Sequence, residues 1–172
     1  IVRALKSPVS TKSLTQSVVR CKSAVLDGEI VVLDNKTGLP SFQNHQRRMN
    51  LDHERDIENL SRQFPASYYL FDILYLDGTD VQNLSFLQRR KILSQIVNEN
   101  ATIKISDFIE EIGEEVYKTT KSMGLEGLVA KNKSSKYVQG KRSSDWLKIK
   151  HIRTQDCVII GYNKGEGTRE KY

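Results

Sequence analysis

A carboxylate and three lysines in the last third of the sequence have the residue types and spacing for chemistry on phosphates. Glu126 begins the run Glu-Gly-Leu-Val-Ala-Lys, which ends at Lys131. Lys148 and Lys150 alternate in the later run Trp-Leu-Lys-Ile-Lys. Ammonium groups neutralise charge on a transferring phosphoryl group, and a carboxylate can hold the divalent ion that bridges the phosphates. These four residues therefore suit the binding of a triphosphate and its metal ion.

Strand periodicity determines which of these side chains can act together. Residues two apart on a strand share a face, so Lys148 and Lys150 can converge on one phosphate group. Taken alone, the same two lysines would equally suit the protection of a solvated edge strand. Strict alternation would place Glu126 and Lys131 on opposite faces. Either only one of those two faces the phosphates, or Glu126 precedes the regular strand.

The segment that joins the two runs is strongly basic. Between positions 131 and 150 a single acid, Asp145, accompanies seven cations: Lys131, Lys133, Lys136, Lys141, Arg142, Lys148 and Lys150. Tyr137 and Trp146 are interleaved with them, and the whole chain has a net charge of +6. Cations interleaved with aromatic side chains favour a phosphate or nucleic-acid surface. A solvated charged loop is the alternative.

Two acids stand in an otherwise apolar stretch, residues 24–33, whose β-branched composition predicts a strand. Asp27 and Glu29 share one face of that strand, and the apolar Leu26 and Ile30 take the other. Two carboxylates among apolar residues are costly unless they are paired or bind a metal ion. The two acids are therefore candidates for a site, with a solvated strand end as the alternative.

The stretch 68–76 gives the clearest strand signal of the sequence, and Asp77-Gly78 is its turn signal. Within this strand Phe71 and Asp72 point to opposite faces. From the pattern alone, Phe71 is most simply an aromatic residue of the core.

Two amphipathic helices must support these strands. Apolar residues recur with helical spacing over 85–98 and over 107–123. Asp107, with Glu110 three residues later, would cap the second helix, and Gly124 would end it. The other expected elements are a polar helix at 42–49, a loop or short helix at 50–66, and short strands at 127–131 and 146–150. This mixture favours an α+β fold with antiparallel strands.

The sequence has 172 residues, of which 38% are hydrophobic and 28% charged, as in ordinary globular proteins. No apolar run approaches the roughly 20 residues that span a bilayer, and no secretory signal is recognisable. Two cysteines without metal-type spacing indicate buried thiols in a reducing compartment. We expect 1–150 to form one domain, and 151–172, with a strand at 156–162, to open a second. Because the first residue is not methionine, we also expect a piece of a longer protein.

Four motifs resemble those of the covalent nucleotidyltransferases, most closely those of the ATP-dependent DNA ligases. Leu-Asp-Gly-Glu at 26–29, with Gly-x-Pro-x-Phe-Gln-x-x-Gln-x-Arg at 38–48, resembles motif III. Phe-Asp at 71–72 resembles motif IIIa, and the runs 126–131 and 146–150 resemble motifs IV and V. The resemblance implies an antiparallel-sheet nucleotidyltransferase (adenylation) domain, N-terminally incomplete, that is followed by the first strand of an OB-fold.

The resemblance also implies the site. The nucleotide-binding residues would be Glu29, Phe71, Lys131, Arg142, Lys148 and Lys150, the metal ligands Glu126 and Glu29, and Asp72 a structural acid. Phe71 would stack on adenine, and Glu29 would contact the ribose or the metal ion. Lys148 and Lys150, the catalytic cations, would bind the α-phosphate and the leaving pyrophosphate. Arg142 would touch ATP phosphate or the DNA backbone. No role follows for Arg3, Phe42 or Arg48.

The implied reaction has three steps, and the sequence lacks its nucleophile. A lysine attacks the α-phosphorus of ATP and keeps AMP as a phosphoramide, AMP passes to a 5′-phosphate at a nick, and a 3′-hydroxyl displaces it. The family takes this lysine from a Lys-x-Asp-Gly motif. At the two Leu-Asp-Gly sequences here, Val25 or Tyr75 stands two residues before the aspartate. We therefore expect that this polypeptide alone forms no enzyme–AMP adduct.

The resemblance further implies ATP and Mg²⁺ or Mn²⁺ as cofactors and nicked duplex DNA as substrate, in DNA repair, recombination or replication. A Ku-type end-binding protein or a clamp is a candidate partner. We expect a monomer in the cytoplasm of a prokaryote, associated with the nucleoid. Two alternatives stay open: an RNA ligase or mRNA-capping guanylyltransferase, and a nucleic-acid-binding module without catalysis.

Overall fold

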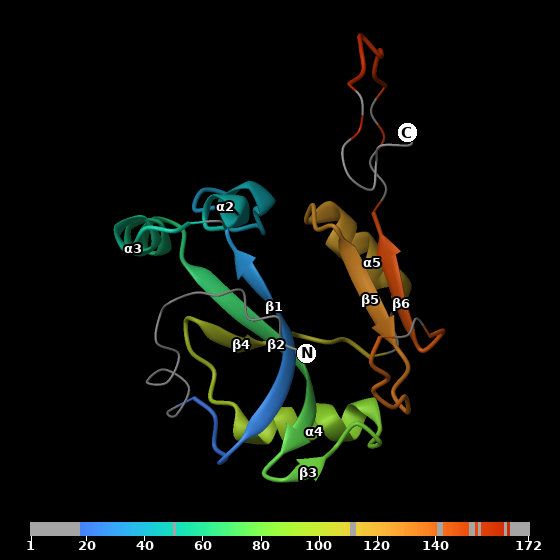
Figure 1. The fold of residues 1–172 in the computed structure, drawn as a ribbon. Helices are drawn as coiled ribbons and strands as arrows, with labels where there is room; N and C mark the ends of the chain where they lie inside the picture. Colours follow the sequence, from blue (N-terminus) through green and yellow to red (C-terminus); the bar gives the residue numbers. More distant parts are fainter. Residues whose placement is uncertain are drawn as a thin grey trace.

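The computed structural model describes residues 18–49, 51–110, 113–140, 143–151, 154, 156–163 and 165. In chain order the elements are β1 (Ala24–Val32), α2 (Phe42–Arg47), α3 (Glu54–Gln63), β2 (Ala66–Leu76), β3 (Thr79–Asp80), α4 (Phe86–Ile96), β4 (Ile103–Ile105), α5 (Gly113–Ser122), β5 (Gly127–Lys131) and β6 (Trp146–Lys150). Figure 1 shows two separate sheets, one built on β1 and β2 and one formed by β5 and β6. The predicted α+β class is confirmed.

The larger sheet is built on one long antiparallel pair. β1 and β2 pair along their whole length, and β3 adds a short antiparallel segment to the end of β2. β4 pairs with the start of β2 in parallel, which departs from the purely antiparallel sheet that the sequence favours. Neither β3 nor β4 is predicted from the sequence, because each has only two or three residues.

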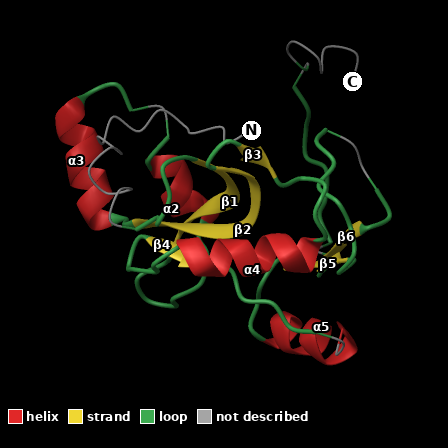
Figure 2. Cartoon of the chain, turned by 90° about the horizontal axis from the view of Figure 1, so that it is seen from below, coloured by secondary structure: helices red, strands yellow, loops and turns green. Residues whose placement is uncertain are grey.

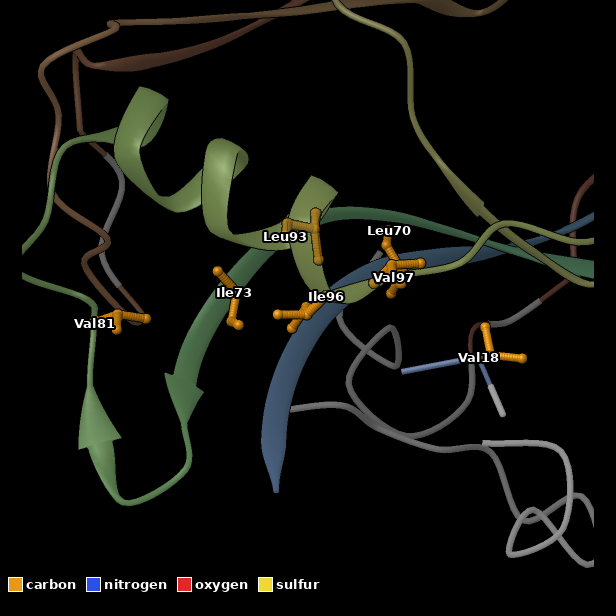
Figure 3. Packing of buried hydrophobic residues seen from close by; sticks show 7 residues of the cluster. All are labelled: Val18, Leu70, Ile73, Val81, Leu93, Ile96 and Val97. Carbon is orange, nitrogen blue, oxygen red and sulfur yellow. The ribbon is translucent and has the colours of Figure 1, made fainter. Parts of the chain in front are cut away.

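α4 packs against this sheet and completes the core (Figure 2). The buried cluster consists of Val18, Leu70, Ile73, Val81, Leu93, Ile96 and Val97 (Figure 3). The helix starts at a capping box in which the Ser85 hydroxyl accepts from the Gln88 N–H and the Gln88 side chain accepts from the Ser85 N–H. Burial of each aliphatic side chain contributes about 1.5–3 kcal/mol, so β2 and α4 form the rigid base of the molecule.

The hairpin of β5 and β6 forms at the residues expected from the sequence. α5 packs beside it, and the hydroxyl of Thr120 lies 2.9 Å from Nε2 of His151, just after β6. The ring of Tyr117 packs on His151 with centroids 4.5 Å apart. As predicted, Gly124 ends this helix, with φ +74° and a bond from the N–H of Leu125 back to the Thr120 carbonyl. Every described helix is too short or too polar to cross a lipid bilayer.

One glycine in each sheet allows two backbones to approach closely. A Cβ at Gly28 on β1 would lie 2.5 Å from the carbonyl oxygen of Tyr69 on β2. Gly127, with φ +157°, would place a Cβ on top of the Ile149 carbonyl of β6. Any side chain at either position would push paired strands apart. The Asp-Gly-Glu and Glu-Gly motifs thus require their glycines for strand pairing.

The helix predicted over 107–123 is wrong at its start. α5 begins at Gly113, and the residues from Asp107 to Glu110 are not helical. Asp107 therefore caps no helix. Glu110, which was expected to complete that cap, forms an ion pair with Lys133 at 2.6 Å instead.

The reason lies in α4, which binds the backbone of this segment. Arg90 donates to the carbonyl of Ser106 at 2.6 Å, and its guanidinium group lies 5.2 Å from the ring centroid of Phe108. The N–H of Ser106 donates to the Leu70 carbonyl at 2.8 Å, which extends the pairing of β4 with β2. A helix that began at Asp107 would disrupt these hydrogen bonds, so they hold the segment in a non-helical conformation.

The strand predicted over 156–162 is also not formed. Residues 156–163 contain neither helix nor strand, and Figure 1 shows them as a loop that extends away from β6. Val158, Ile159 and Ile160 are 86–99% exposed, so this apolar run joins no sheet within the described part of the chain. The assignment of 151–172 to the opening of an OB-fold stays a prediction.

Candidate functional site

The β5–β6 hairpin presents three lysines on one face. Lys148 lies opposite Val129, Lys150 lies opposite the first residue of β5, and Lys131 lies opposite Trp146. Side chains directly opposite in an antiparallel pair share a face, as do residues two apart on one strand. The three lysines therefore project from the same side of the hairpin, which we call the lysine face (Lys131, Lys148 and Lys150).

Glu126 lies at the edge of the lysine face. It precedes β5, so the second of the two arrangements that the sequence allowed is correct. One oxygen, Oε1, lies 3.3 Å from Nζ of both Lys148 and Lys150. Hydrogen bonds from these lysines lower the pKa of the Glu126 carboxyl, which is therefore ionised at neutral pH. The side chain is 71% exposed, so solvent, a metal ion or phosphates can replace these pairs at little cost.

Lys131, in contrast, is withdrawn into a cage of three aromatic rings. Its Nζ lies 3.7 Å from the ring centroid of Trp146, 4.5 Å from that of Phe71 and 4.9 Å from that of Phe86. A cation within about 6 Å of an aromatic face is attracted by the ring quadrupole. Burial lowers the pKa of Lys131 to about 8, although Asp72 opposes the shift. Lys131 therefore begins to lose its proton just above neutral pH.

Phe71 connects the two sheets. It belongs to β2 but is not one of the buried core residues, and its ring meets Lys131 of β5. The next residue, Asp72, is fully buried and is bound by α4 instead. Phe71 thus contacts the hairpin and Asp72 contacts α4, as expected for adjacent residues of a strand, which point to opposite faces. The interpretation of Phe71 as a core aromatic is wrong, because the ring faces the hairpin.

Asp72 and Arg89 form a buried ion pair that joins β2 to α4. Nε and an Nη of Arg89 donate to the two carboxylate oxygens at 2.7 and 3.1 Å, and both side chains are 0% exposed. The remaining guanidinium nitrogen donates to the carbonyls of Leu84 and Ser135, at 2.5 and 3.1 Å. A single arginine therefore fixes β2, the start of α4 and the loop that follows β5.

The structural roles of Arg89 and Arg90 were not predicted from the sequence, although the position of Arg89 on an apolar stripe indicated one. Arg89 comes three residues after Phe86 and four before Leu93, so it lies on the buried stripe of α4. A charged side chain on an apolar stripe is costly unless it is paired. The acid on the strongest predicted strand, Asp72, was the available partner.

Tyr137 ties the loop after β5 to β1. Its hydroxyl donates to Oδ2 of Asp27 at 2.6 Å, and its ring packs edge-on against Trp146, with centroids 5.5 Å apart. Burial and the bond to Asp27 raise the pKa of Tyr137. Asp27 thus has a structural partner, whereas the side chain of Glu29 is exposed and has no hydrogen bond or ion pair within the described part of the chain.

The remaining residues singled out by the sequence lie away from this site or outside the described residues. Phe42 is 72% exposed on α2, and Arg48 donates to the Phe64 carbonyl at 2.7 Å beside α3. Arg3, Lys141 and Arg142 lie outside the described residues.

The residues present fit a Mg²⁺ ion that arrives with a nucleotide. Within the described ranges, no three His, Cys, Asp or Glu side chains gather as a ready metal site. Mg²⁺ commonly takes one or two carboxylates and completes its shell with water and substrate phosphates. An exposed carboxylate beside phosphate-binding lysines, as Glu126 is, meets that requirement.

Comparison with known proteins supports the arrangement of these motifs. Residues 4–150 match the family model described as "ATP dependent DNA ligase domain". The multifunctional non-homologous end joining DNA repair protein LigD of Mycobacterium tuberculosis is 35% identical over 145 residues, which cover 84% of this chain and 17% of that protein. A DNA ligase of Archaeoglobus fulgidus is 36% identical over 154 residues, which cover 86% of this chain and 27% of that protein. The chain thus spans well under a third of these relatives.

Solved structures agree with the sequence relatives. The crystal structure of the ligase domain from M. tuberculosis LigD matches with a TM-score of 0.57 and 31% identity, over 74% of this chain and 37% of that one. A mycobacterial DNA ligase D complexed with ATP and MES matches with a TM-score of 0.57 and 30% identity, over 74% and 38%. The motifs, the fold and the match over residues 4–150 together show that the chain belongs to the ATP-dependent DNA ligase domain family.

Proposed function

We propose that this chain supplies the nucleotide-binding part of the adenylation domain of an ATP-dependent DNA ligase. The observation that carries the proposal is the lysine face, with Glu126 at its edge and the Phe71 ring against Lys131. A nucleoside triphosphate bound there would meet cations at its phosphates, a carboxylate at its metal ion and an aromatic ring at its base.

Lys148 and Lys150 are the catalytic cations of this proposal. When ATP binds, they exchange the Glu126 carboxylate for the α-phosphate and the leaving pyrophosphate. Their charges then stabilise the negative charge that develops as the bond from the α-phosphorus to the pyrophosphate oxygen breaks. Glu126, released from both lysines, would hold Mg²⁺, and the ion would supply positive charge that neutralises the phosphates.

The other predicted residues complete the nucleotide site. Phe71 carries the adenine ring, and Lys131 adds a further phosphate contact. Glu29, which is exposed on β1, contacts the ribose or the metal ion. Arg142 contacts an ATP phosphate or the DNA backbone.

The lysine that receives AMP is supplied from outside these 172 residues, because the sequence contains no Lys-x-Asp-Gly motif. That lysine attacks the α-phosphorus, and pyrophosphate leaves. AMP then passes to the 5′-phosphate at a nick, from which a 3′-hydroxyl displaces it and seals the strand. The contribution of this chain is to hold ATP in place and to stabilise the charge on its phosphates.

The basic segment from Lys131 to Lys150 suits nicked duplex DNA as the second substrate. Relatives from bacteria and archaea support a prokaryotic protein. Its location in the cytoplasm and its association with the nucleoid stay predictions. The name of the LigD relative supports a part in DNA repair, with recombination and replication as further settings. A Ku-type or clamp partner, a monomeric state and the choice between Mg²⁺ and Mn²⁺ stay predictions.

Binding of ATP and adenosine to variants of the chain tests the proposal, because adenosine lacks phosphates. We expect Lys148→Ala and Lys150→Ala each to weaken ATP binding about tenfold or more, since each removes a charge-assisted hydrogen bond. Adenosine binding should not change. Lys91→Ala, which removes an exposed lysine of α4 outside the basic segment, is the control. Equal ATP affinity in the control and in both variants would contradict the assignment.

The missing nucleophile favours a second candidate, a nucleic-acid-binding module that never reacts with ATP. Such a module would bind nicked duplex DNA with a steep salt dependence and would show no affinity for ATP. Equilibrium dialysis of the wild-type chain with ATP distinguishes these two functions. Part of an adenylation domain should bind ATP at the lysine face, whereas a nucleic-acid-binding module should not.

A further inference from the structure

We propose that Lys131 gates the adenine platform: its ammonium group lies over the ring of Phe71, and a nucleotide that binds there displaces it towards the phosphates. The inference rests on the proposed function, because it takes Phe71 as the surface on which adenine stacks. It gives Lys131 a second task as a positioning residue, since the lysine competes with the base before it binds phosphate.

The competition follows from the space over the Phe71 ring. Nζ of Lys131 lies 4.5 Å from the ring centroid. Aromatic rings that pack together have centroids about 4.5–7 Å apart, so a base on this face of the ring needs the space that the ammonium group fills. Trp146 and Phe86 enclose the same Nζ, at 3.7 and 4.9 Å. Base and lysine therefore exclude one another from the cage.

Burial without an ion pair in the described part of the chain makes the ammonium group of Lys131 easy to release from the cage. Burial is the main cause of its lowered pKa. Asp72 and Asp27 stabilise the ammonium group, whereas Arg90 and Arg89 destabilise it. Among the described residues Lys131 forms no ion pair, so the rings are its direct partners. A charge-assisted hydrogen bond to phosphate is stronger than such contacts, and an uncharged base is better suited to the buried cage.

The path from the cage to the phosphates is short. Lys131 lies opposite Trp146, and Lys148 follows two residues later on the same face. Such diagonal neighbours have Cβ atoms about 7–8 Å apart, which long side chains can bridge. A change of rotamer in the four-carbon stem of Lys131 therefore carries its charge from the rings to a phosphate bound by Lys148.

Adenosine separates the two tasks of Lys131, because it has the base but no phosphate. Equilibrium dialysis with radiolabelled adenosine and ATP would compare wild type, Lys131→Ala and Lys131→Arg. Lys131→Ala removes both the stem and the charge from the cage, so we expect adenosine to bind about five- to tenfold more tightly and ATP about tenfold more weakly. Lys131→Arg should return both affinities towards wild type, and Lys91→Ala, the control that removes an exposed lysine of α4, should change neither.

A measurement on the wild-type chain tests the gate without any variant. The protonated amine of Lys131 is attracted to the Phe71 ring as a cation, and the neutral amine is not. Adenosine should therefore bind several-fold more tightly at pH 9.5 than at pH 7. Adenosine affinity that is the same in wild type and Lys131→Ala, and independent of pH, would overturn the gate while ATP binding upheld the proposed function. Failure of the wild-type chain to bind either ligand would overturn both.

Discussion

Two ion-pair clusters in this molecule have similar chemistry and opposite surroundings. Asp72 and Arg89 are 0% exposed, share two hydrogen bonds and engage two backbone carbonyls. Glu126 forms single 3.3 Å contacts with Lys148 and Lys150, and all three side chains are more than half exposed. The first cluster cannot lose a partner without leaving a buried charge, whereas the second can exchange partners with solvent.

This difference separates the residues that build the site from those that bind its ligands. The buried pair fixes the positions of β2, α4 and the loop after β5, and hence the aromatic cage. The exposed cluster is left free to meet phosphates and a metal ion. Substitutions in the two clusters should therefore affect different properties, with stability lost at the first and ligand binding lost at the second.

The largest effect is expected for Arg89→Ala. It leaves the Asp72 carboxylate buried without its cationic partner, so the free energy of unfolding should fall by about 3–5 kcal/mol in urea denaturation. Lys148→Ala, the matched change in the exposed cluster, should cost less than about 0.5 kcal/mol. Equal losses of unfolding free energy in the two variants would contradict the different roles of the buried and the exposed cluster.

A smaller effect is expected for Phe71→Ala, which lies where the two regions meet. Loss of the stacking surface should weaken adenosine binding by about 1–3 kcal/mol, as measured by equilibrium dialysis. Phe42→Ala, which removes an exposed phenylalanine on α2, is the control and should leave the affinity unchanged. The same loss in both variants would show that adenine does not stack on Phe71.

Lys131 should give a pH dependence that neither cluster shows. Its pKa in the folded chain is about 8, below the ordinary lysine value of about 10.4, so the fold disfavours the protonated form. The unfolding free energy of wild type relative to Lys131→Met should therefore rise as pH increases from about 8 to about 10.4. Emission of Trp146, the single tryptophan, should also titrate near pH 8 in wild type only. A flat emission profile in wild type would contradict the caged lysine.

The smallest effect on stability is expected for Glu126→Gln. The exposed pairs contribute little, so unfolding in urea should change by less than about 0.5 kcal/mol. The contribution of Mg²⁺ to ATP affinity, measured with and without EDTA, should largely disappear because the metal ion loses its carboxylate. Retention of the full Mg²⁺ effect would place the metal ion elsewhere.

The sequence predicts the elements that local patterns determine. β5 and β6 occupy the predicted residues because alternation and flanking turn residues define short strands, and α4 follows its apolar spacing. The four charged residues at the hairpin were predicted for the same reason. The sequence did not determine whether Glu126 lies within β5 or before it. The structure places it before the strand, which begins at Gly127, where the backbone of β6 approaches closely.

Features that depend on distant contacts were not predictable in this way. Trp146 lies opposite Lys131 in the hairpin, but Phe86 reaches Lys131 only because the start of α4 lies beside the hairpin, and no local pattern encodes that contact. The start of α5 was misplaced because Arg90, on a different helix, binds the preceding segment. The roles of Glu29 and Arg142 rest on the family resemblance alone.

A structure of this chain with ATP and Mg²⁺ would show whether the lysine face binds the phosphates. We predict that the α-phosphate contacts Lys148 and Lys150, that Glu126 has left both lysines for the metal ion, and that adenine has replaced Lys131 on Phe71. A triphosphate bound elsewhere, with the Glu126 pairs and the aromatic cage intact, would contradict it.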